Sequence, residues 1–153
     1  MLGGQGCRAA APTPEARVLA AVADSASGNA HDLRGRAGRP LMIDVGSFAR
    51  HGEAFGAPVS KRQMEASIRS PHRDAREREA IRCARVHSYC RVWHDGVYVR
   101  MDSLARAGSG GFSAFVTCVW PDRRLLGMVH LRVDVRRQGA GWLVSPPAVE
   151  WIT

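Results

Sequence analysis

The chain has 153 residues, of which 45% are hydrophobic and 24% are charged, a balance typical of one globular domain with its own core. This composition excludes a disordered chain, a collagen-like chain and a small disulfide scaffold. The longest apolar runs are only a few residues, far below the roughly 18 that a membrane-spanning helix needs, so we expect no transmembrane segment.

The chain is strongly basic, with a formal net charge of +8, and among its 22 basic residues only Lys61 is a lysine. An excess of this size favours polyanionic partners: nucleic acid, anionic lipid headgroups or acidic protein surfaces. Arginine makes forked, stacked and partly buried contacts that lysine makes less well. An arginine-rich surface therefore suits a permanent protein interface at least as well as it suits phosphate groups.

The amino-terminal residues 1–12 are rich in Gly and Ala and are predicted to form a flexible arm. They lack the charged and apolar regions of a targeting signal. A helix is expected to begin next, because Thr13 can cap it, Pro14 suits its first position and Glu15 favours its positive end. This helix should end between residues 25 and 28.

Residues 13–153 are predicted to form a single α+β domain. The region 25–58 is expected to be rich in loops, since glycines and arginines interrupt residues 25–39 and residues 46–58 show no period. Within it, the apolar residues 40–45 predict one short, buried strand.

Residues 60–80 are predicted to be helical. Ser60 and Gln63 match a capping box at the start of a second helix. Ser70 and Pro71 then predict a third helix by the same logic of cap and proline, with the charged residues 74–79 toward solvent.

The pattern changes to a period of two over residues 86–153, which predicts an antiparallel sheet. We expect a hairpin over 88–104 with its tight turn at Asp95-Gly96. The strand 112–120 is apolar on both faces and should be central. The remaining predicted strands are 128–136, with its odd-numbered residues 129–135 facing the core, then 142–144 and 149–152, separated by a kink at Pro146-Pro147.

The predicted fold is thus a set of amino-terminal helices packed on a curved antiparallel meander of about four to five strands. This order, with Gly-Trp-Leu-Val at 141–144 and Val-Glu-Trp at 149–151, resembles the nuclear transport factor-like superfamily of cystatin-like α+β rolls over residues 60–153. The resemblance implies a cone whose interior holds a catalytic or ligand site in some members. Because the superfamily contains enzymes, binding modules and accessory subunits, it leaves the function open.

Four cysteines have no zinc-binding spacing. Cys83 and Cys90 are predicted either to be small buried residues or to form a disulfide that ties the third helix to the first strand of the sheet. Cys7 and Cys118 stand apart from them. A catalytic thiol is not expected, because no base is placed beside any of the four.

Histidines and aspartates recur on the predicted sheet, among them His130 and Asp134. These two lie on one strand, about 13 Å apart at about 3.3 Å per residue, so they do not pair directly. We interpret such residues as surface polar positions and expect no catalytic site, no metal and no cofactor.

Arginine and tryptophan are enriched at the contact centres of protein interfaces, and both are abundant here. The sequence predicts a non-catalytic accessory or scaffold subunit that docks on a larger assembly. The predicted interface residues are Arg34, Arg36, Arg39, Arg73, Arg76, Arg132, Arg136 and Trp151.

The expected partners are the protein subunits of that assembly, with anionic lipid headgroups as a further contact. A membrane-bound bioenergetic complex of a bacterium, photosynthetic or respiratory, is the host we expect, with a membrane-peripheral and preferably periplasmic location. Two alternatives stay open: a roll-type enzyme or small-ligand binder that uses the cone interior, and an accessory protein that binds RNA or DNA.

Overall fold

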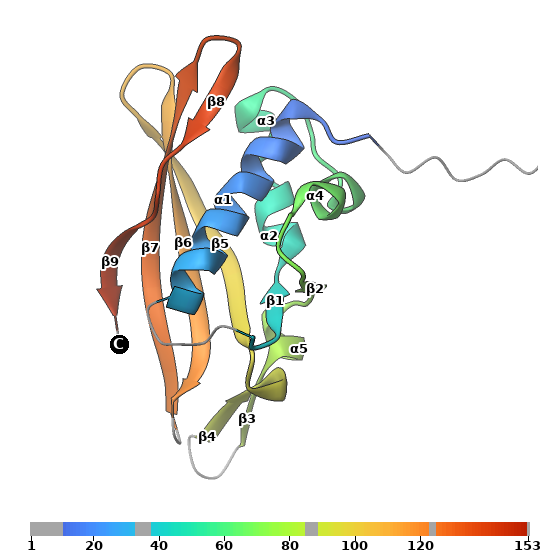
Figure 1. The fold of residues 1–153 in the computed structure, drawn as a ribbon, viewed down its shortest axis with the longest axis vertical. Helices are drawn as coiled ribbons and strands as arrows, with labels where there is room; N and C mark the ends of the chain where they lie inside the picture. The colour runs from blue at the N-terminus through green and yellow to red at the C-terminus, as the bar shows by residue number, and fades with distance from the viewer. Residues whose placement is uncertain (1–10, 33–37, 85–88, 123–124, 153) are drawn as a thin grey trace, which may run out of the picture.

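The computed structural model describes residues 11–32, 38–84, 89–122 and 125–152 (Figure 1). The helices are α1 (Pro14–Asp32), α2 (Val45–Ala49), α3 (Gly52–Phe55), α4 (Lys61–Ser67) and α5 (Glu77–Ala80). The strands are β1 (Leu41–Ile43), β2 (Arg73–Asp74), β3 (Ile81–Ala84), β4 (Tyr89–Val92), β5 (Val97–Ala107), β6 (Gly111–Asp122), β7 (Leu125–Gln138), β8 (Gly141–Val144) and β9 (Ala148–Ile152). A short turn of 3-10 helix, η1 (Trp93–Asp95), joins β4 to β5.

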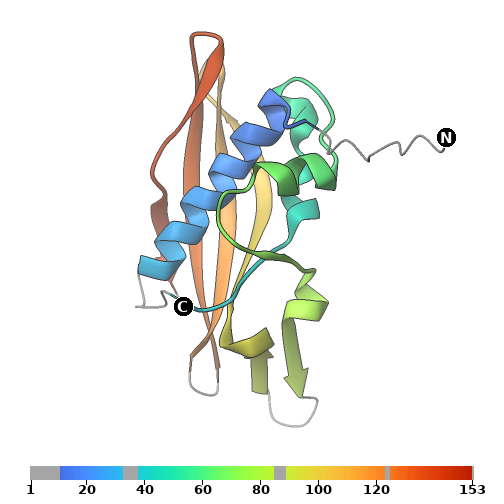
Figure 2. The same cartoon turned by 45° about the vertical axis from the view of Figure 1, so that its right-hand side comes forward.

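The strands form a seven-stranded main sheet in the order β2-β1-β5-β6-β7-β8, and β9 also pairs with β7. The strands from β5 to β9 are antiparallel, whereas β1 runs parallel to both β2 and β5. Helix α1 lies across one face of this curled sheet, with α2 and α4 beside it (Figures 1 and 2). The α+β prediction is confirmed: helices pack on a curved, mostly antiparallel sheet.

The core lies between α1 and the sheet. Leu19 and Val22 from α1 are fully buried against the strands, together with Phe48 from α2. Burial of each such side chain contributes about 1.5–3 kcal/mol to folding, which makes this layer the main source of stability. Among the described helices, none has the length and apolar character needed to cross a membrane.

The predicted central strand and the alternation of its neighbour are confirmed. β6 lies between β5 and β7, and its inward residues are buried. On β7 the odd-numbered residues 129–135 are all at most 1% exposed, while His130 and Arg132 on the other face stay partly accessible. The kink at Pro146-Pro147 also separates two strands as expected, β8 and β9.

Two of the three helix starts that were predicted from caps are confirmed. The Ala16 N–H donates to Thr13 Oγ1 at 3.2 Å. Ser60 and Gln63 form the predicted reciprocal capping box at the start of α4. Local side-chain chemistry is sufficient for these two boundaries, because each cap bonds to residues within one turn of itself.

The loop predicted for residues 25–39 is wrong in its first part, because α1 continues to Asp32. Ala26 and Ser27 are buried against the sheet, and the Ser27 hydroxyl donates to the Ala23 carbonyl oxygen at 2.7 Å. Burial of this turn outweighs the weak helix propensity of its Ser and Gly residues. Residues 33–37, which include Arg34 and Arg36, lie outside the described part of the chain.

The loop-rich region predicted for 25–58 also contains two short helices, α2 and α3. The Asp44 side chain accepts from the Ser47 N–H at 3.1 Å and so caps α2 directly after β1. Phe48 and Phe55 are both buried and hold these helices to the core. The predicted strand over 40–45 is confirmed as β1, with all three of its residues buried.

The third helix predicted from Ser70-Pro71 is wrong. Arg73 and Asp74 instead form β2, which pairs with β1, and the Ala75 N–H donates to the Ile43 carbonyl oxygen at 3.1 Å. Only Glu77–Ala80 is helical, as the single turn α5. Pairing with β1 takes this segment into the sheet, so a contact distant in sequence overrides the local pattern.

The hairpin predicted over 88–104 is wrong as well, because β4 pairs with β3 rather than with β5. His94 and Asp95 both have positive φ, 48° and 54°, and their turn carries the chain from one sheet to the other. A Cβ on Gly96 would lie 2.5 Å from the Pro40 carbonyl oxygen, so only glycine fits beside β1. Asp95-Gly96 therefore forms a turn as predicted, but this turn joins two different sheets and not the two strands of one hairpin.

Candidate functional site

The hairpin β3–β4 projects from one end of the main sheet as a separate two-stranded sheet (Figure 2). Its root is fixed by Ala80 and Val92, which are buried in a second apolar cluster with Tyr98 and Val119 of the main sheet. This cluster lies on the face opposite α1. The hairpin is thus anchored at its base and open along its length.

A disulfide joins Cys83 to Cys90, which face each other across β3 and β4. The bridge therefore ties two strands together, not a helix to a strand as predicted. Cys118 is fully buried, and burial, reinforced by Asp102, raises the pKa of its thiol to about 12. That thiol is a packed apolar group. Cys7 lies outside the described residues.

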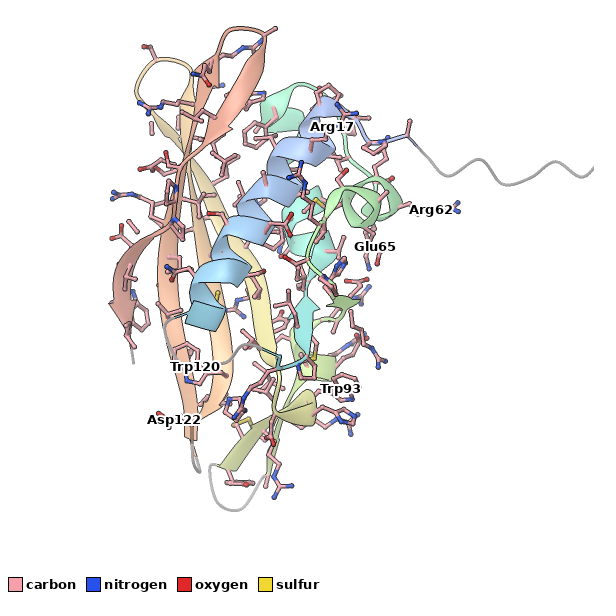
Figure 3. The ribbon with its side chains drawn as sticks, viewed as in Figure 1. Arg17, Arg62, Glu65, Trp93, Trp120 and Asp122 are labelled. Carbon is pink, nitrogen blue, oxygen red and sulfur yellow. A yellow bond between two sulfur atoms is a disulfide. The ribbon has the colours of Figure 1, made fainter. Side chains whose placement is uncertain are left out.

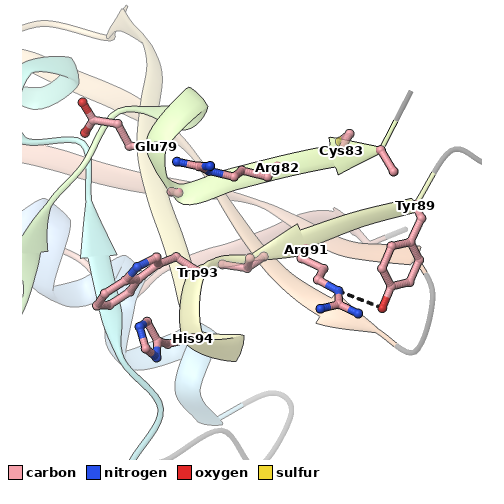
Figure 4. Close-up of a pocket in the computed structure, with 10 residues that line it drawn as sticks. Glu79, Arg82, Cys83, Tyr89, Arg91, Trp93 and His94 are labelled. Atoms are coloured by element: carbon pink, nitrogen blue, oxygen red, sulfur yellow. Dashed lines mark hydrogen bonds between the residues drawn. The ribbon is translucent and has the colours of Figure 1, made fainter. Parts of the chain in front are cut away.

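A hollow of about 530 Å³ opens on the hairpin (Figure 4). Its wall is largely apolar, while its rim carries Arg82, Arg91 and Glu79. Tyr89 and Trp93 border it from β4 and the turn that follows. We call this the hairpin hollow.

Two guanidinium groups stack on the aromatic rings around this hollow. The Arg73 guanidinium lies 4.7 Å from the Trp93 ring centre, and the Arg91 guanidinium lies 5.0 Å from that of Tyr89. Arg91 Nε also donates to the Tyr89 hydroxyl at 3.1 Å. Such stacking holds the guanidinium planes in place while leaving their N–H groups free to meet an anion.

The turn after β4 brings a further predicted interface residue to the same place. Arg39 Nη1 donates to the Asp95 carbonyl oxygen at 2.9 Å. The His94 ring packs edge-on against the Trp93 ring, which is 37% exposed and lies near the base of the hairpin (Figure 3). Trp120, by contrast, is buried in the sheet.

A second hollow, of about 750 Å³, lies on the other side of β3. Arg50, Arg76 and Arg78 line it, and Cys83 borders both hollows. Its two carboxylates are already engaged. Asp44 accepts from the Ser47 N–H and the Tyr98 hydroxyl, while Glu77 pairs with Arg100 at 2.6 Å.

The arginines around these two hollows share one property: among the described residues, none of them forms an ion pair with a carboxylate. We define the hairpin surface as the two hollows together with the arginines that border them. Those arginines are Arg50, Arg73, Arg76, Arg78, Arg82 and Arg91.

The outer face of the main sheet differs, because two of its arginines, Arg100 and Arg132, are paired with carboxylates. Arg132 lies 3.3 Å from Asp134 and 3.0 Å from Glu150. Arg100 lies 2.8 Å from Asp102 and also contacts Glu77. We call this region the sheet face.

A polar chain runs across the sheet face from β5 to β7. The Thr117 hydroxyl donates to Asp102, and its oxygen is hydrogen-bonded to His130 Nδ1 at 3.1 Å. Burial lowers the pKa of His130, although Asp102 opposes the shift. The Trp151 ring stacks on the imidazole at 3.6 Å.

These contacts correct the picture of isolated polar residues on the sheet, while His130 and Asp134 remain apart as predicted. Thr117 is 0% exposed, so its hydroxyl is not placed to attack a substrate. Thr117 and His130 are register partners on neighbouring strands. The alternating pattern could have placed them on one face, but only the register brings them into contact.

The predicted interface residues therefore separate into two groups. Arg39, Arg73 and Arg76 lie around the hairpin surface, whereas Arg132 and Trp151 lie on the sheet face. Arg136 is exposed near the far end of β7. Arg50, Arg78, Arg82 and Arg91 were not among the predicted interface residues. Arg82 and Arg91 meet only because β3 pairs with β4. Arg50 and Arg78 lie at the short helices beside the second hollow, so no local pattern shows that the four share one surface.

The inner face of the sheet is filled by its own side chains. Met101, Val116 and Leu131 are each at most 1% exposed and pack toward α1. Among the described residues, no three side chains of His, Cys, Asp and Glu come together as a metal site requires. Comparisons with protein-family models, with curated proteins and with solved structures found no match. The resemblance to the roll superfamily stays a prediction.

Proposed function

We propose that this protein is a non-catalytic accessory subunit that docks on an acidic protein partner through its hairpin surface. The observation that supports this is a set of arginines around the two hollows that have no carboxylate partner among the described residues. Carboxylates nearby are already used: Asp74 pairs with Lys61, and Glu79 accepts from the Arg76 N–H at 3.1 Å. The surface is therefore left with an excess of positive charge that a partner can neutralise.

The chemistry of the hairpin surface favours an acidic protein segment over nucleic acid. Single-stranded nucleic acid binds by stacking its bases on free aromatic faces. Here a guanidinium already covers a face of Trp93 and of Tyr89, which hinders the stacking of bases on these rings. The stacked guanidinium groups keep their forks for bidentate contact with carboxylates, which needs no free aromatic face.

A probe peptide tests the proposal. The probe is a capped peptide of about eight residues in which Glu alternates with Val, and its binding is measured by fluorescence anisotropy. The comparison probes are a single-stranded oligonucleotide and vesicles of anionic lipid. We expect binding of the peptide that weakens with salt and is stronger than binding of the other two probes. Preferential binding of the oligonucleotide would instead establish the nucleic-acid alternative.

The membership in a larger assembly is tested separately, in the cells from which the sequence comes. We expect a tagged chain to comigrate with a larger complex on native gels. A variant with Arg82→Glu and Arg91→Glu should migrate alone, because the docking contacts are lost. Migration of the unaltered chain as a free monomer would contradict the proposal.

A further inference from the structure

Strand β3 has one edge without a partner. In the described residues its only neighbouring strand is β4, and Figures 2 and 4 show β3 on the outer side of the hairpin. The Ile81 N–H is used by α5, since it donates to the Glu77 carbonyl oxygen. The following residues, Arg82 to Ala84, are all exposed. Backbone groups along such an edge are a template for another strand.

The two hollows lie on opposite faces of this same strand. Side chains alternate between the faces of a strand. Ile81 and Cys83 border the second hollow, whereas Arg82 and Ala84 border the hairpin hollow, which Cys83 also reaches. A strand added beside β3 would therefore direct its successive side chains alternately toward one hollow and the other.

We propose that the partner binds by strand addition: an extended acidic segment of the partner pairs with the free edge of β3. This inference rests on the docking function proposed above and specifies how the same surface is used. One set of side chains of the added strand enters the largely apolar hairpin hollow. The other set meets Arg50, Arg76 and Arg78 in the second hollow. The segment is thus expected to alternate apolar and acidic residues over about four positions, the length of β3.

The positive charge beside the free edge of β3 favours an acidic segment over other strands. Arginines beside an open edge discourage pairing with a like-charged strand. A second copy of β3 would bring Arg82 of each copy toward the hairpin hollow, whereas the acidic segment places apolar side chains there and carboxylates in the second hollow. The small Ala84 and the disulfide-bound Cys83 leave the backbone accessible for this pairing.

The experiment uses the whole protein and four versions of the alternating Glu-Val peptide. The first is the parent, and the second has the same composition with the Glu and Val residues in separate blocks. The third and fourth carry N-methyl groups on either the Val or the Glu backbone nitrogens. Only one of these two sets of N–H groups can face β3 in an added strand.

Strand addition predicts that one methylated peptide binds at least about tenfold more weakly than the other, and that the block peptide binds about tenfold more weakly than the parent. Equal affinities of the two methylated peptides would overturn strand addition while leaving the docking function intact. Failure of the parent peptide itself to bind would overturn the docking function instead. The two proposals therefore fail by different results.

Discussion

The hairpin surface and the sheet face are both rich in arginine, but they use it differently. On the sheet face, Arg100 and Arg132 each contact two carboxylates, one on their own strand and one on another element. On the hairpin surface, within the described residues, Arg82 and Arg91 contact no carboxylate, and Arg91 rests on Tyr89. On the sheet face, the charge of these arginines is thus neutralised within the chain. On the hairpin surface, the charge is left for a partner to neutralise.

This difference shows why arginine content alone does not locate an interface. A guanidinium that already has its carboxylates gains little from a new one, because each new contact must replace an existing one. A stacked guanidinium with free N–H groups loses little freedom when a carboxylate arrives. The comparison predicts that the two surfaces respond differently to the same change of charge.

The largest expected effect comes from reversing charge on the hairpin surface. The double variant Arg82→Glu and Arg91→Glu should weaken binding of the Glu-Val peptide by about a hundredfold. The matched control is Arg132→Glu with Arg136→Glu, which changes the net charge equally on β7 of the main sheet. It should alter affinity by no more than about threefold. Equal losses in both variants would mean that the surfaces do not differ.

A smaller effect is expected from opening the disulfide of the hairpin. Two-stranded sheets are marginally stable alone, so Cys83→Ser with Cys90→Ser should loosen the part beyond Cys83. We expect a loss of about 2 kcal/mol in the free energy of unfolding of the hairpin and about tenfold weaker peptide binding. Amide hydrogen exchange should rise in β3 and β4 but not in β6. Unchanged exchange in the hairpin would show that the bridge is not what holds it.

Removing the polar chain of the sheet face should lower the stability of the protein without changing peptide binding. Thr117→Val keeps the shape of the side chain but leaves Asp102 and His130 without the hydroxyl between them. We expect a loss of about 1 kcal/mol in the free energy of unfolding, measured in urea. Affinity for the peptide should stay the same. Weaker binding in this variant would connect the two regions and contradict their separation.

The smallest effect concerns pH. Because burial lowers the pKa of His130 in the folded protein, the unfolded chain binds a proton more readily. Stability should therefore fall as the pH drops below about 6.5, the ordinary pKa of histidine, and level off below the lowered value. His130→Gln should reduce this slope. His51, whose pKa burial also lowers, remains in both proteins, so the difference isolates His130. Identical pH dependence of the free energy of unfolding in the unaltered protein and in His130→Gln would contradict the burial of His130.

Much of the fold could be predicted from the sequence, since its signals are local. The alternation on β7 is carried by valines and leucine at every second position, and the cap of α4 by Ser60 and Gln63 within one turn. The errors arose where distant segments decide. Residues 73–74 became a strand because β1 lies beside them, and residues 26–27 stayed helical because the sheet covers them.

The candidate site was predicted only in part for the same reason. Arg39, Arg73 and Arg76 were predicted as interface residues because arginine is abundant in the chain. Cys83 and Cys90 were predicted as a possible disulfide from their spacing. The hollows themselves depend on β3 pairing with β4 rather than β4 with β5. No local pattern distinguishes these two pairings, because only a few residues separate β4 from β3 on one side and from β5 on the other.

The most direct test of the difference between the two surfaces is an NMR titration of the protein with the Glu-Val peptide. Amide and arginine Nε–H signals are followed across both regions. We predict that the shifts concentrate in β3, β4 and the arginines of the two hollows, while Arg100, Arg132 and Trp151 stay unchanged. Shifts centred on the sheet face, or spread equally over both surfaces, would contradict the account.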